Sequence, residues 1–403
     1  MSKLGTPTAL GPGTHIVHED GGCCAASFDQ TMTVGVIGSE VDLDLHGLVS
    51  IRLIGASRDE VAAVRRQLGP LPPTQDREPE IVIRFVDRIE TSSRVRYLGL
   101  DDVAFSDDAF LVLRGKHKAS VKVALDFAEL GGHTEIVCER GLAAVPFLVP
   151  ILNLTVLAKG VLPLHASAFV HEGIGVVATG WSKGGKTEAL LAFARRGARY
   201  VGDEWVYVSS GGGRVSGIPQ PIRVWRWHLR QVPECEALLE RGERTKLRAI
   251  ELLLASERPV RRLGPEPVVR GFSRLTPLLK RQLYVDIDPV RLFGRIGPLS
   301  ASFDRLFFLV SHEAPELSVE AINPLAVAER MVFSLQHELL DFVGAYLKFR
   351  FAFPDSANSL IEQAEDLQRK ALARAFMGKP AYVVHHPYPV SLSALFDAMS
   401  PYC

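Results

Sequence analysis

Residues 180–187 read GWSKGGKT, and this stretch decides the fold that we expect around it. It matches the phosphate-binding pattern of glycine, four free positions, glycine, lysine and then serine or threonine. Glycine permits the backbone angles that turn successive N–H groups toward phosphate oxygens. The dipole of a following helix, the ammonium group of Lys186 and the hydroxyl of Thr187 would then serve phosphate and magnesium.

The flanking sequence supplies the strand and the helix that this pattern requires. Residues 173–180 (GIGVVATG) are a short β-branched run, typical of a buried strand, and residues 162–172 predict another strand before it. Residues 188–197 (EALLAFARRG) have helical periodicity and end in glycine. We therefore expect a P-loop in an α/β core, with these nucleotide-binding residues: Gly180, Trp181, Ser182, Lys183, Gly184, Gly185, Lys186, Thr187 and Glu188.

An acidic pair lies beyond the loop. Asp203 and Glu204 stand inside the apolar run 198–208, at a distance from Thr187 that allows one helix and a return on a neighbouring strand. Both carboxylates are then expected to face the phosphates and to hold magnesium with Thr187. A surface turn is the alternative, although a paired acid in an apolar strand is costly to bury without a cation. His165, in the strand beside the loop strand, is a further candidate, and a hydrogen-bonded core histidine is its alternative.

Over about residues 162–208 the chain resembles the kinase core of the HPr kinase/phosphorylase family. That family combines a histidine strand, a glycine loop with serine at its third position, and an acidic pair after a helix that ends in Arg-Gly. The matching residues here are His165, Gly180, Ser182, Gly185, Lys186, Thr187, Arg196, Gly197, Asp203 and Glu204.

The resemblance implies a kinase that uses ATP and Mg²⁺ to phosphorylate a hydroxyl group. It implies that Asp203 is the base, that His165 assists in activating the acceptor, and that Glu204 contacts the metal. The roles of the two acids could exchange. Lys186 completes the catalytic set. The first 150 residues do not resemble the N-terminal domain of the bacterial regulator, so we expect an acceptor other than HPr.

The composition is that of a folded protein without a charge bias. The chain has 403 residues, with 46 basic and 46 acidic side chains, which argues against a nucleic-acid or anionic-membrane partner. Its five cysteines are few and lack metal-site spacing, as expected for a cytoplasmic protein. The apolar stretch 142–164 is interrupted by prolines and polar residues, so it predicts a buried helix and no membrane span.

Four regions are expected along the chain. Residues 1–30 predict a flexible N-terminus and residues 31–150 an α+β recognition or assembly domain. In that domain, residues 33–38 predict a strand, and alternation over residues 80–87 and 133–140 predicts antiparallel strands. Residues 151–320 form the expected P-loop kinase core. Residues 321–403 predict a mostly helical region with one long helix over 356–377.

Two functions follow from these observations. The first is an ATP- and magnesium-dependent kinase acting on a hydroxyl of a peptide, a protein or a small metabolite. The alternative is a non-catalytic or slowly hydrolysing nucleotide-binding module that senses ATP and binds a partner. The sequence leaves the acceptor, the nucleotide preference and the formation of homo-oligomers open.

Overall fold

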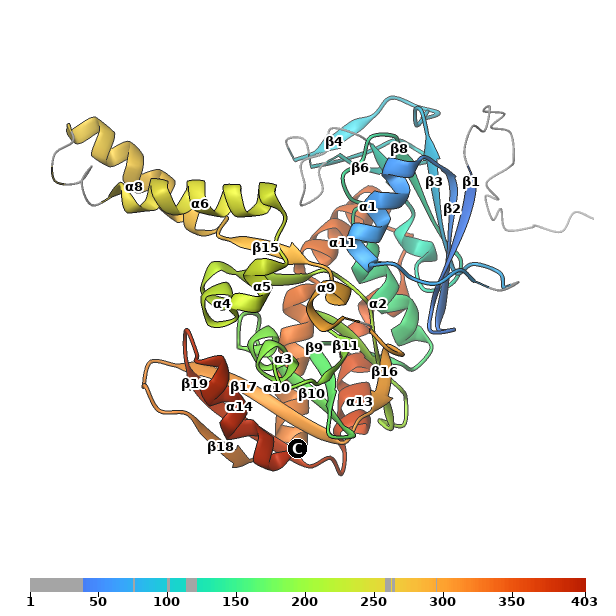
Figure 1. Cartoon of the computed structure of the whole chain (residues 1–403). Coiled ribbons are helices and arrows are strands. Elements are labelled where there is room, and N and C mark those ends of the chain that lie inside the picture. The colour runs from blue at the N-terminus through green and yellow to red at the C-terminus, as the bar shows by residue number, and fades with distance from the viewer. Residues whose placement is uncertain are drawn as a thin grey trace, which may run out of the picture. The chain divides into compact units, whose positions relative to one another are not determined.

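The computed structural model describes residues 39–403, apart from 75–76, 100–101, 114–121, 258–261, 263–264 and 295. These residues form a mixed α/β protein with two large sheets and helices packed on them (Figure 1). The strand predicted over residues 33–38, the flexible segment 1–30, Cys23 and Cys24 lie outside the described residues.

The larger sheet contains the strand that leads into the glycine loop. Its nine strands follow the order β16-β13-β12-β9-β10-β17-β19-β18, and β11 also pairs with β9. Neighbours β10, β17 and β19 run parallel, and the other pairs are antiparallel. The bounds are β9 (Leu162–His171), β10 (Ile174–Gly180), β11 (Arg199–Gly202), β12 (Trp205–Val208), β13 (Arg214–Gly217), β16 (Ser300–Ser302), β17 (Arg305–His312), β18 (Ser318–Ala321) and β19 (Ala381–Pro387).

Helices cover both faces of this sheet because side chains alternate along its strands. In β17, Phe307 and Leu309 enter the core shared with α3 (Lys186–Ala194) and α14 (Leu392–Met399). Leu306 and Phe308 enter the opposite core, shared with α10 (Pro324–Glu338) and α13 (Ala364–Phe376). A period of two directs alternate residues to opposite faces, so each face needs its own helical layer. The strand predicted over 173–180 is therefore buried on both sides.

The smaller sheet has eight strands in the order β1-β2-β3-β8-β7-β6-β5-β4. The predicted antiparallel pairing is wrong at the centre of this sheet, because β3 runs parallel to both β2 and β8. Helix α1 (Arg58–Leu68) supplies the crossover between β2 and β3 that parallel neighbours need. The bounds are β1 (Ser39–Leu45), β2 (Val49–Ala56), β3 (Ile81–Val86), β4 (Arg96–Leu98), β5 (Val103–Phe105), β6 (Phe110–Val112), β7 (Val123–Leu125) and β8 (Thr134–Glu139).

The buried helix predicted within residues 142–164 is α2 (Leu148–Ala158), and the last residues of that stretch begin β9. Among the described residues, we find no helix with the length and apolarity needed to cross a bilayer.

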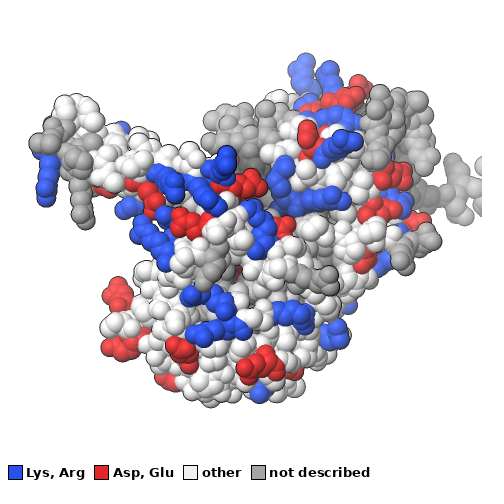
Figure 2. All heavy atoms as spheres, in the orientation of Figure 1, with Lys and Arg blue, Asp and Glu red and all other residues white. Residues whose placement is uncertain are grey.

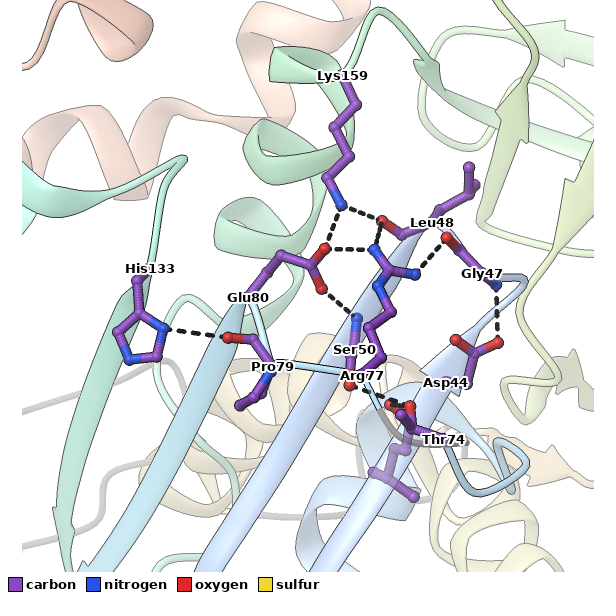
Figure 3. Close-up of polar contacts among 11 residues, drawn as sticks. Asp44, Gly47, Leu48, Ser50, Thr74, Arg77, Pro79, Glu80, His133 and Lys159 are labelled. Carbon is purple, nitrogen blue, oxygen red and sulfur yellow. Dashed lines mark hydrogen bonds and ion pairs between the residues drawn. The ribbon is translucent and has the colours of Figure 1, made fainter.

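A polar cluster around Glu80 ties the end of α2 to the smaller sheet (Figure 3). The Glu80 carboxylate accepts the Ser50 N–H at 2.6 Å and pairs with Arg77 and Lys159. Burial acts to raise the pKa of Glu80, but the bonds from Lys159, Ser50 and Arg77 outweigh it and lower that pKa. Because Lys159 directly follows α2 and Glu80 directly precedes β3, this cluster holds the helix end against the sheet.

The C-terminal segment contributes helices to both sheets and one strand to the larger sheet. Helix α11 (Leu340–Ala352) packs on the smaller sheet, and β19 joins β17. The single helix predicted over 356–377 is wrong, because the chain forms α12 (Ser359–Glu362) and then α13. Asn358 caps the start of α12, and its amide donates to three carbonyl oxygens near the short helix Phe127–Glu129, which fixes where α12 begins.

A helical insertion separates the strands of a small third sheet. Strands β14 and β15 pair antiparallel, and of the helices between them α6 and α8 extend away from both large sheets (Figure 1). The bounds are β14 (Ile222–Trp225), α4 (Arg226–Gln231), α5 (Pro233–Ala237), α6 (Arg241–Ala255), α8 (Glu266–Lys280), β15 (Tyr284–Ile287) and α9 (Pro289–Phe293).

Candidate functional site

The loop between β10 and α3 has the predicted order of strand, glycine turn and helix. Gly185, the N-cap of α3, has φ +106°, which residues with a β-carbon rarely adopt. A β-carbon on Gly180 would lie 2.5 Å from the carbonyl oxygen of Leu309 in β17. Glycine at these positions lets the chain turn sharply from the sheet into a helix N-terminus, where free N–H groups attract anions.

Lys186 is buried at the start of α3, with only 6% of its surface exposed. Its Nζ donates to the carbonyl oxygen of Trp181 at 3.0 Å and lies 3.5 Å from that of Gly180. Burial lowers the pKa of Lys186, although nearby carboxylates, Glu204 first, oppose the shift. No carboxylate lies within ion-pair distance of this Nζ among the described residues. A phosphate oxygen would therefore stabilise the ammonium group.

Asp203 reaches the first turn of α3 from the turn between β11 and β12. Its Oδ2 accepts a hydrogen bond from Thr187 Oγ1 at 3.1 Å, and its Oδ1 accepts one from Ser167 Oγ at 2.6 Å. The residue is only 2% exposed, and burial, together with the charge of Glu204, raises the pKa of Asp203. The chain thus returns to the loop as predicted, although β11 pairs with β9 and not with the loop strand.

Glu204 turns away from Asp203 and binds His165. Glu204 has φ +64°, a left-handed conformation that directs the two neighbouring acids differently. Its Oε2 lies 3.0 Å from His165 Nε2. On the other side of the ring, His165 Nδ1 is 3.1 Å from Glu338 Oε1, close enough for an ion pair but not aligned for a hydrogen bond. The His165 ring also stacks on Trp205, with ring centroids 5.5 Å apart.

The electrostatic surroundings shift the pKa values of Asp203 and Glu204 in opposite directions. Burial acts to raise the pKa of Glu204, but the bond from His165 and the charges of His165, Lys186 and Arg223 lower it. Burial acts to raise the pKa of Glu338 as well, but His165 and Lys186 lower it overall. Burial and Lys186 act to lower the pKa of His165, yet its two carboxylate partners raise it overall. The cluster therefore favours a charged Glu204–His165–Glu338 group beside a more readily protonated Asp203.

The remaining predicted loop residues lie around this centre. Trp181 is exposed and stacks on His337 of α10, with ring centroids 4.9 Å apart. Lys183 is exposed in a left-handed conformation, and Ser182 is half-buried beside it. Glu188 does not join the acidic cluster, because its Oε1 pairs with His228 Nε2 of α4 at 3.2 Å in a buried position.

Sequence reasoning missed three residues that the fold brings to the loop. Ser167 precedes the loop on β9. Glu338 lies on α10 directly after His337; this His-Glu pair resembles the start of a metalloprotease motif, but the motif's second histidine is missing. His386 of β19 is fully buried, and its Nε2 lies 2.9 Å from the Gly184 carbonyl oxygen. Glu338 and His386 come from segments far along the chain and carry no local signal for this site. Ser167 could have been noted as a hydroxyl two residues from His165 on the same strand face.

No family model matches this chain, and no curated protein matches it either. The resemblance to HPr kinase cores therefore rests on the residues quoted above alone.

The chemistry of Thr187 and Asp203 fits magnesium. A hydroxyl and a carboxylate 3.1 Å apart offer the oxygen ligands that Mg²⁺ prefers, and Mg²⁺ commonly uses one or two carboxylates together with substrate phosphates. Within the part of the chain that the structure describes, no three His, Cys, Asp or Glu side chains gather into a metal cage. Thr187 and Asp203 therefore suit a magnesium ion shared with nucleotide phosphates.

Replacing Gly185 by alanine should destabilise the fold and distort the loop. The substitution forces a β-carbon into a left-handed conformation and brings it 2.5 Å from His386 Nε2. We expect a loss of about 1–3 kcal/mol in the free energy of unfolding, measured by urea denaturation. Gly173→Ala is the matched control, because its φ is +87° but nothing lies within 4 Å of the added β-carbon. Equal losses in both variants would show that the contact with His386 does not matter.

Asp203→Asn should change how stability depends on pH. The pKa of Asp203 is raised in the folded chain, so the folded state binds this proton more tightly than the unfolded state. The resulting stabilisation is complete below the unfolded aspartate pKa of about 4 and is lost as pH rises through the folded pKa. Relative to the wild type, Asp203→Asn should therefore gain stability from about pH 4 to about pH 7 in metal-free buffer. Urea denaturation at constant ionic strength measures this, with exposed Asp366→Asn as the control. A difference that does not vary with pH would contradict the assignment.

Proposed function

We propose that this chain is a kinase that uses ATP and Mg²⁺ to phosphorylate a hydroxyl group of a peptide, a protein or a small metabolite. The observation that carries this proposal is the contact between Thr187 and Asp203, 3.1 Å apart in the first turn of the helix after the glycine loop. A hydroxyl and a carboxylate at this place are the protein groups that hold Mg²⁺ beside the phosphates of a nucleotide. Lys186, buried one residue earlier, would bind the β- and γ-phosphate oxygens.

The geometry supports one assignment of the two acids. Asp203 is closed off from solvent and both its oxygens contact hydroxyl groups, which favours a metal-binding role with Thr187. The Glu204 side chain is 49% exposed and is oriented by His165, which favours contact with the acceptor. A general base must first reach the proton that it removes, and only then does its pKa matter. We therefore assign Asp203 to the metal and Glu204, oriented by His165, to the acceptor hydroxyl.

In the proposed reaction, the acceptor oxygen forms a bond to the γ-phosphorus while the bond from that phosphorus to the β–γ bridging oxygen breaks. The acceptor proton passes to the Glu204 carboxylate, and the products are ADP and a phosphate monoester. Bound Mg²⁺ would supply charge neutralisation on the phosphate oxygens. Glu338 would act as a positioning residue, because it lies on the far side of the His165 ring from Glu204.

The resemblance to HPr kinase cores supports the same reaction class. We place the activity in the cytoplasm, because the described cysteines Cys138 and Cys403 are free thiols. The acceptor and any assembly of the chain into homo-oligomers are not assigned by these residues.

Incubation of the full chain with γ-labelled ATP, Mg²⁺ and fractionated extract tests the proposal. Mass spectrometry should identify an acceptor that gains phosphate on a hydroxyl, in proportion to the ADP formed. ATP binding without any phosphorylated acceptor, or hydrolysis that no fraction redirects, would contradict a kinase and favour the nucleotide-sensing alternative.

A further inference from the structure

Two helices, α6 and α8, project from the molecule and contribute no residue to the candidate site described above. Helices α6 and α8 form an arm: they pack on each other and extend from the β14–β15 pair (Figure 1). The base of the arm is well anchored, because Leu247 enters the core and Glu251 pairs with Arg226 and Arg230 of α4.

The outer part of the arm exposes large apolar side chains. On α6 and α8 the fully buried side chains are Leu247, Ile250 and Thr276. Five aliphatic side chains further along the arm are between 47% and 73% exposed: Leu252, Leu253, Val268, Leu275 and Leu278. Single exposed leucines are ordinary, but such a group on a projecting element marks a surface that contacts a partner.

The arm is also strongly basic in a chain without net charge. Residues 241–281 contain eleven basic and four acidic side chains, whereas the whole chain has 46 of each. Figure 2 shows Lys and Arg side chains interspersed with Asp and Glu where the arm leaves the body. Within the described ranges, eight of the arm's cations form no ion pair: Arg241, Arg244, Lys246, Arg248, Arg262, Arg274, Lys280 and Arg281. Such a surface attracts a partner of opposite charge.

The base of the arm lies close to the candidate site. Arg223 of β14 binds Asp286 of β15 at 2.8 Å, and its guanidinium lies 4.1 Å from the ring centroid of Tyr284. Helix α4, which follows β14 and pairs with the base of the arm, also contacts the loop helix α3, because His228 Nε2 lies 3.2 Å from Glu188 Oε1. The base of the arm is therefore joined through α4 to the helix that carries Thr187.

We propose that the arm binds an acidic, amphipathic polypeptide segment and thereby presents its hydroxyl side chain to Glu204. The presentation of the hydroxyl rests on the proposed kinase function, whereas binding to the arm does not. The exposed leucines favour a polypeptide over a nucleic acid, because a charged phosphate backbone offers no apolar surface against which aliphatic side chains can be buried.

Fluorescence anisotropy of a labelled peptide with the full chain, without nucleotide, tests the binding. The probe is a helical peptide of about 20 residues with leucine on one face, glutamate elsewhere and one serine near its end. One control peptide replaces every glutamate by lysine, and another replaces every leucine by serine. We expect the acidic amphipathic peptide to bind at least about tenfold more tightly than either control, and more weakly as salt rises.

Two arm variants test the location. Arg274→Glu/Leu278→Ser on α8 and Arg248→Glu/Leu252→Ser on α6 should each weaken binding at least about tenfold. Lys370→Glu/Leu325→Ser, exposed substitutions on α13 and α10, is the matched control and should bind like the wild type. Thermal unfolding checks that each variant is folded, as expected for surface changes. Equal binding of the acidic and the charge-reversed peptides, unchanged binding by both arm variants, or tighter binding of a labelled single-stranded RNA would overturn the proposal.

A phosphotransfer assay with the same peptide separates the two proposals. Arm-dependent binding without phosphorylation of the serine supports the arm and contradicts the kinase for this acceptor. Phosphorylation that both arm variants leave unchanged supports the kinase and contradicts the arm.

Discussion

Lys186→Met should reduce phosphotransfer at least about a hundredfold, because a cation that acts on charge in the transition state is among the strongest single contributions to catalysis. The Lys186 ammonium group lies in the loop, bonded to the carbonyl oxygen of Trp181, with no carboxylate partner among the described residues. Its charge is therefore available to the β- and γ-phosphates. Methionine keeps much of the side-chain volume but cannot supply that charge.

The same substitution should change stability little. Burying the ammonium group of Lys186 costs free energy in the folded chain, because the charge loses its contact with water. The lowered pKa of Lys186 reflects this cost. Removing the charge removes this cost together with the hydrogen bonds, so we expect a change within about 1 kcal/mol in the free energy of unfolding. Initial rates with labelled ATP and urea denaturation measure the two effects, with exposed Lys370→Met as the control. A variant that keeps its rate within about threefold of the wild type would contradict the role of Lys186.

The second large effect is a difference between Asp203→Asn and Glu204→Gln. Asp203→Asn should raise the Mg²⁺ concentration for half-maximal rate at least about tenfold, because the amide is a weaker metal ligand beside Thr187. Glu204→Gln should lower kcat about a hundredfold to ten-thousandfold without changing the Mg²⁺ requirement, because it removes the group that takes the acceptor proton. These values come from initial rates over a series of Mg²⁺ concentrations.

The Mg²⁺ dependence of the two variants shows which acid binds the metal and which is the base. Asp366→Asn, on the exposed face of α13, controls for the loss of an unrelated carboxylate. The opposite result, with the Mg²⁺ requirement raised only in Glu204→Gln, would show that Glu204 binds the metal and that Asp203 is the base. Unchanged kinetics in both variants would contradict the site as a whole.

Local sequence predicted much of the candidate site because its central residues are close in the chain. The loop pattern requires glycines, Lys186 and Thr187 within eight consecutive positions, and the acidic pair follows after one helix. The direction of each acid was not predictable. Asp203 and Glu204 are adjacent, yet the left-handed backbone of Glu204 turns one toward Thr187 and the other toward His165. The two residue types give no sign of this conformation, which occurs in the turn between β11 and β12.

The sequence predicted an element correctly where its pattern of apolar residues reported how that element is buried. Strand β10 and helix α2 lie within the residues expected for them, because a continuous apolar run identifies a buried element. The orientation of β3 was wrong, since alternation reports which faces are buried and not which way the neighbouring strand runs. The start of α12 depends on the contacts of Asn358 with the segment between β7 and β8, which lies far away in sequence.

By itself the sequence determined the glycine loop, its strand and helix, and the presence of two acids and a histidine near it, because short-range geometry imposes these residue types. The tertiary structure alone decided that Glu338 and His386 reach the loop and that Asp203 is buried while Glu204 is half exposed. It also decided that a basic, apolar arm extends from the strand pair beside the site. These features depend on how α10, β19 and the β14–β15 pair pack around β10, and packing between distant segments leaves no periodic signal in the chain.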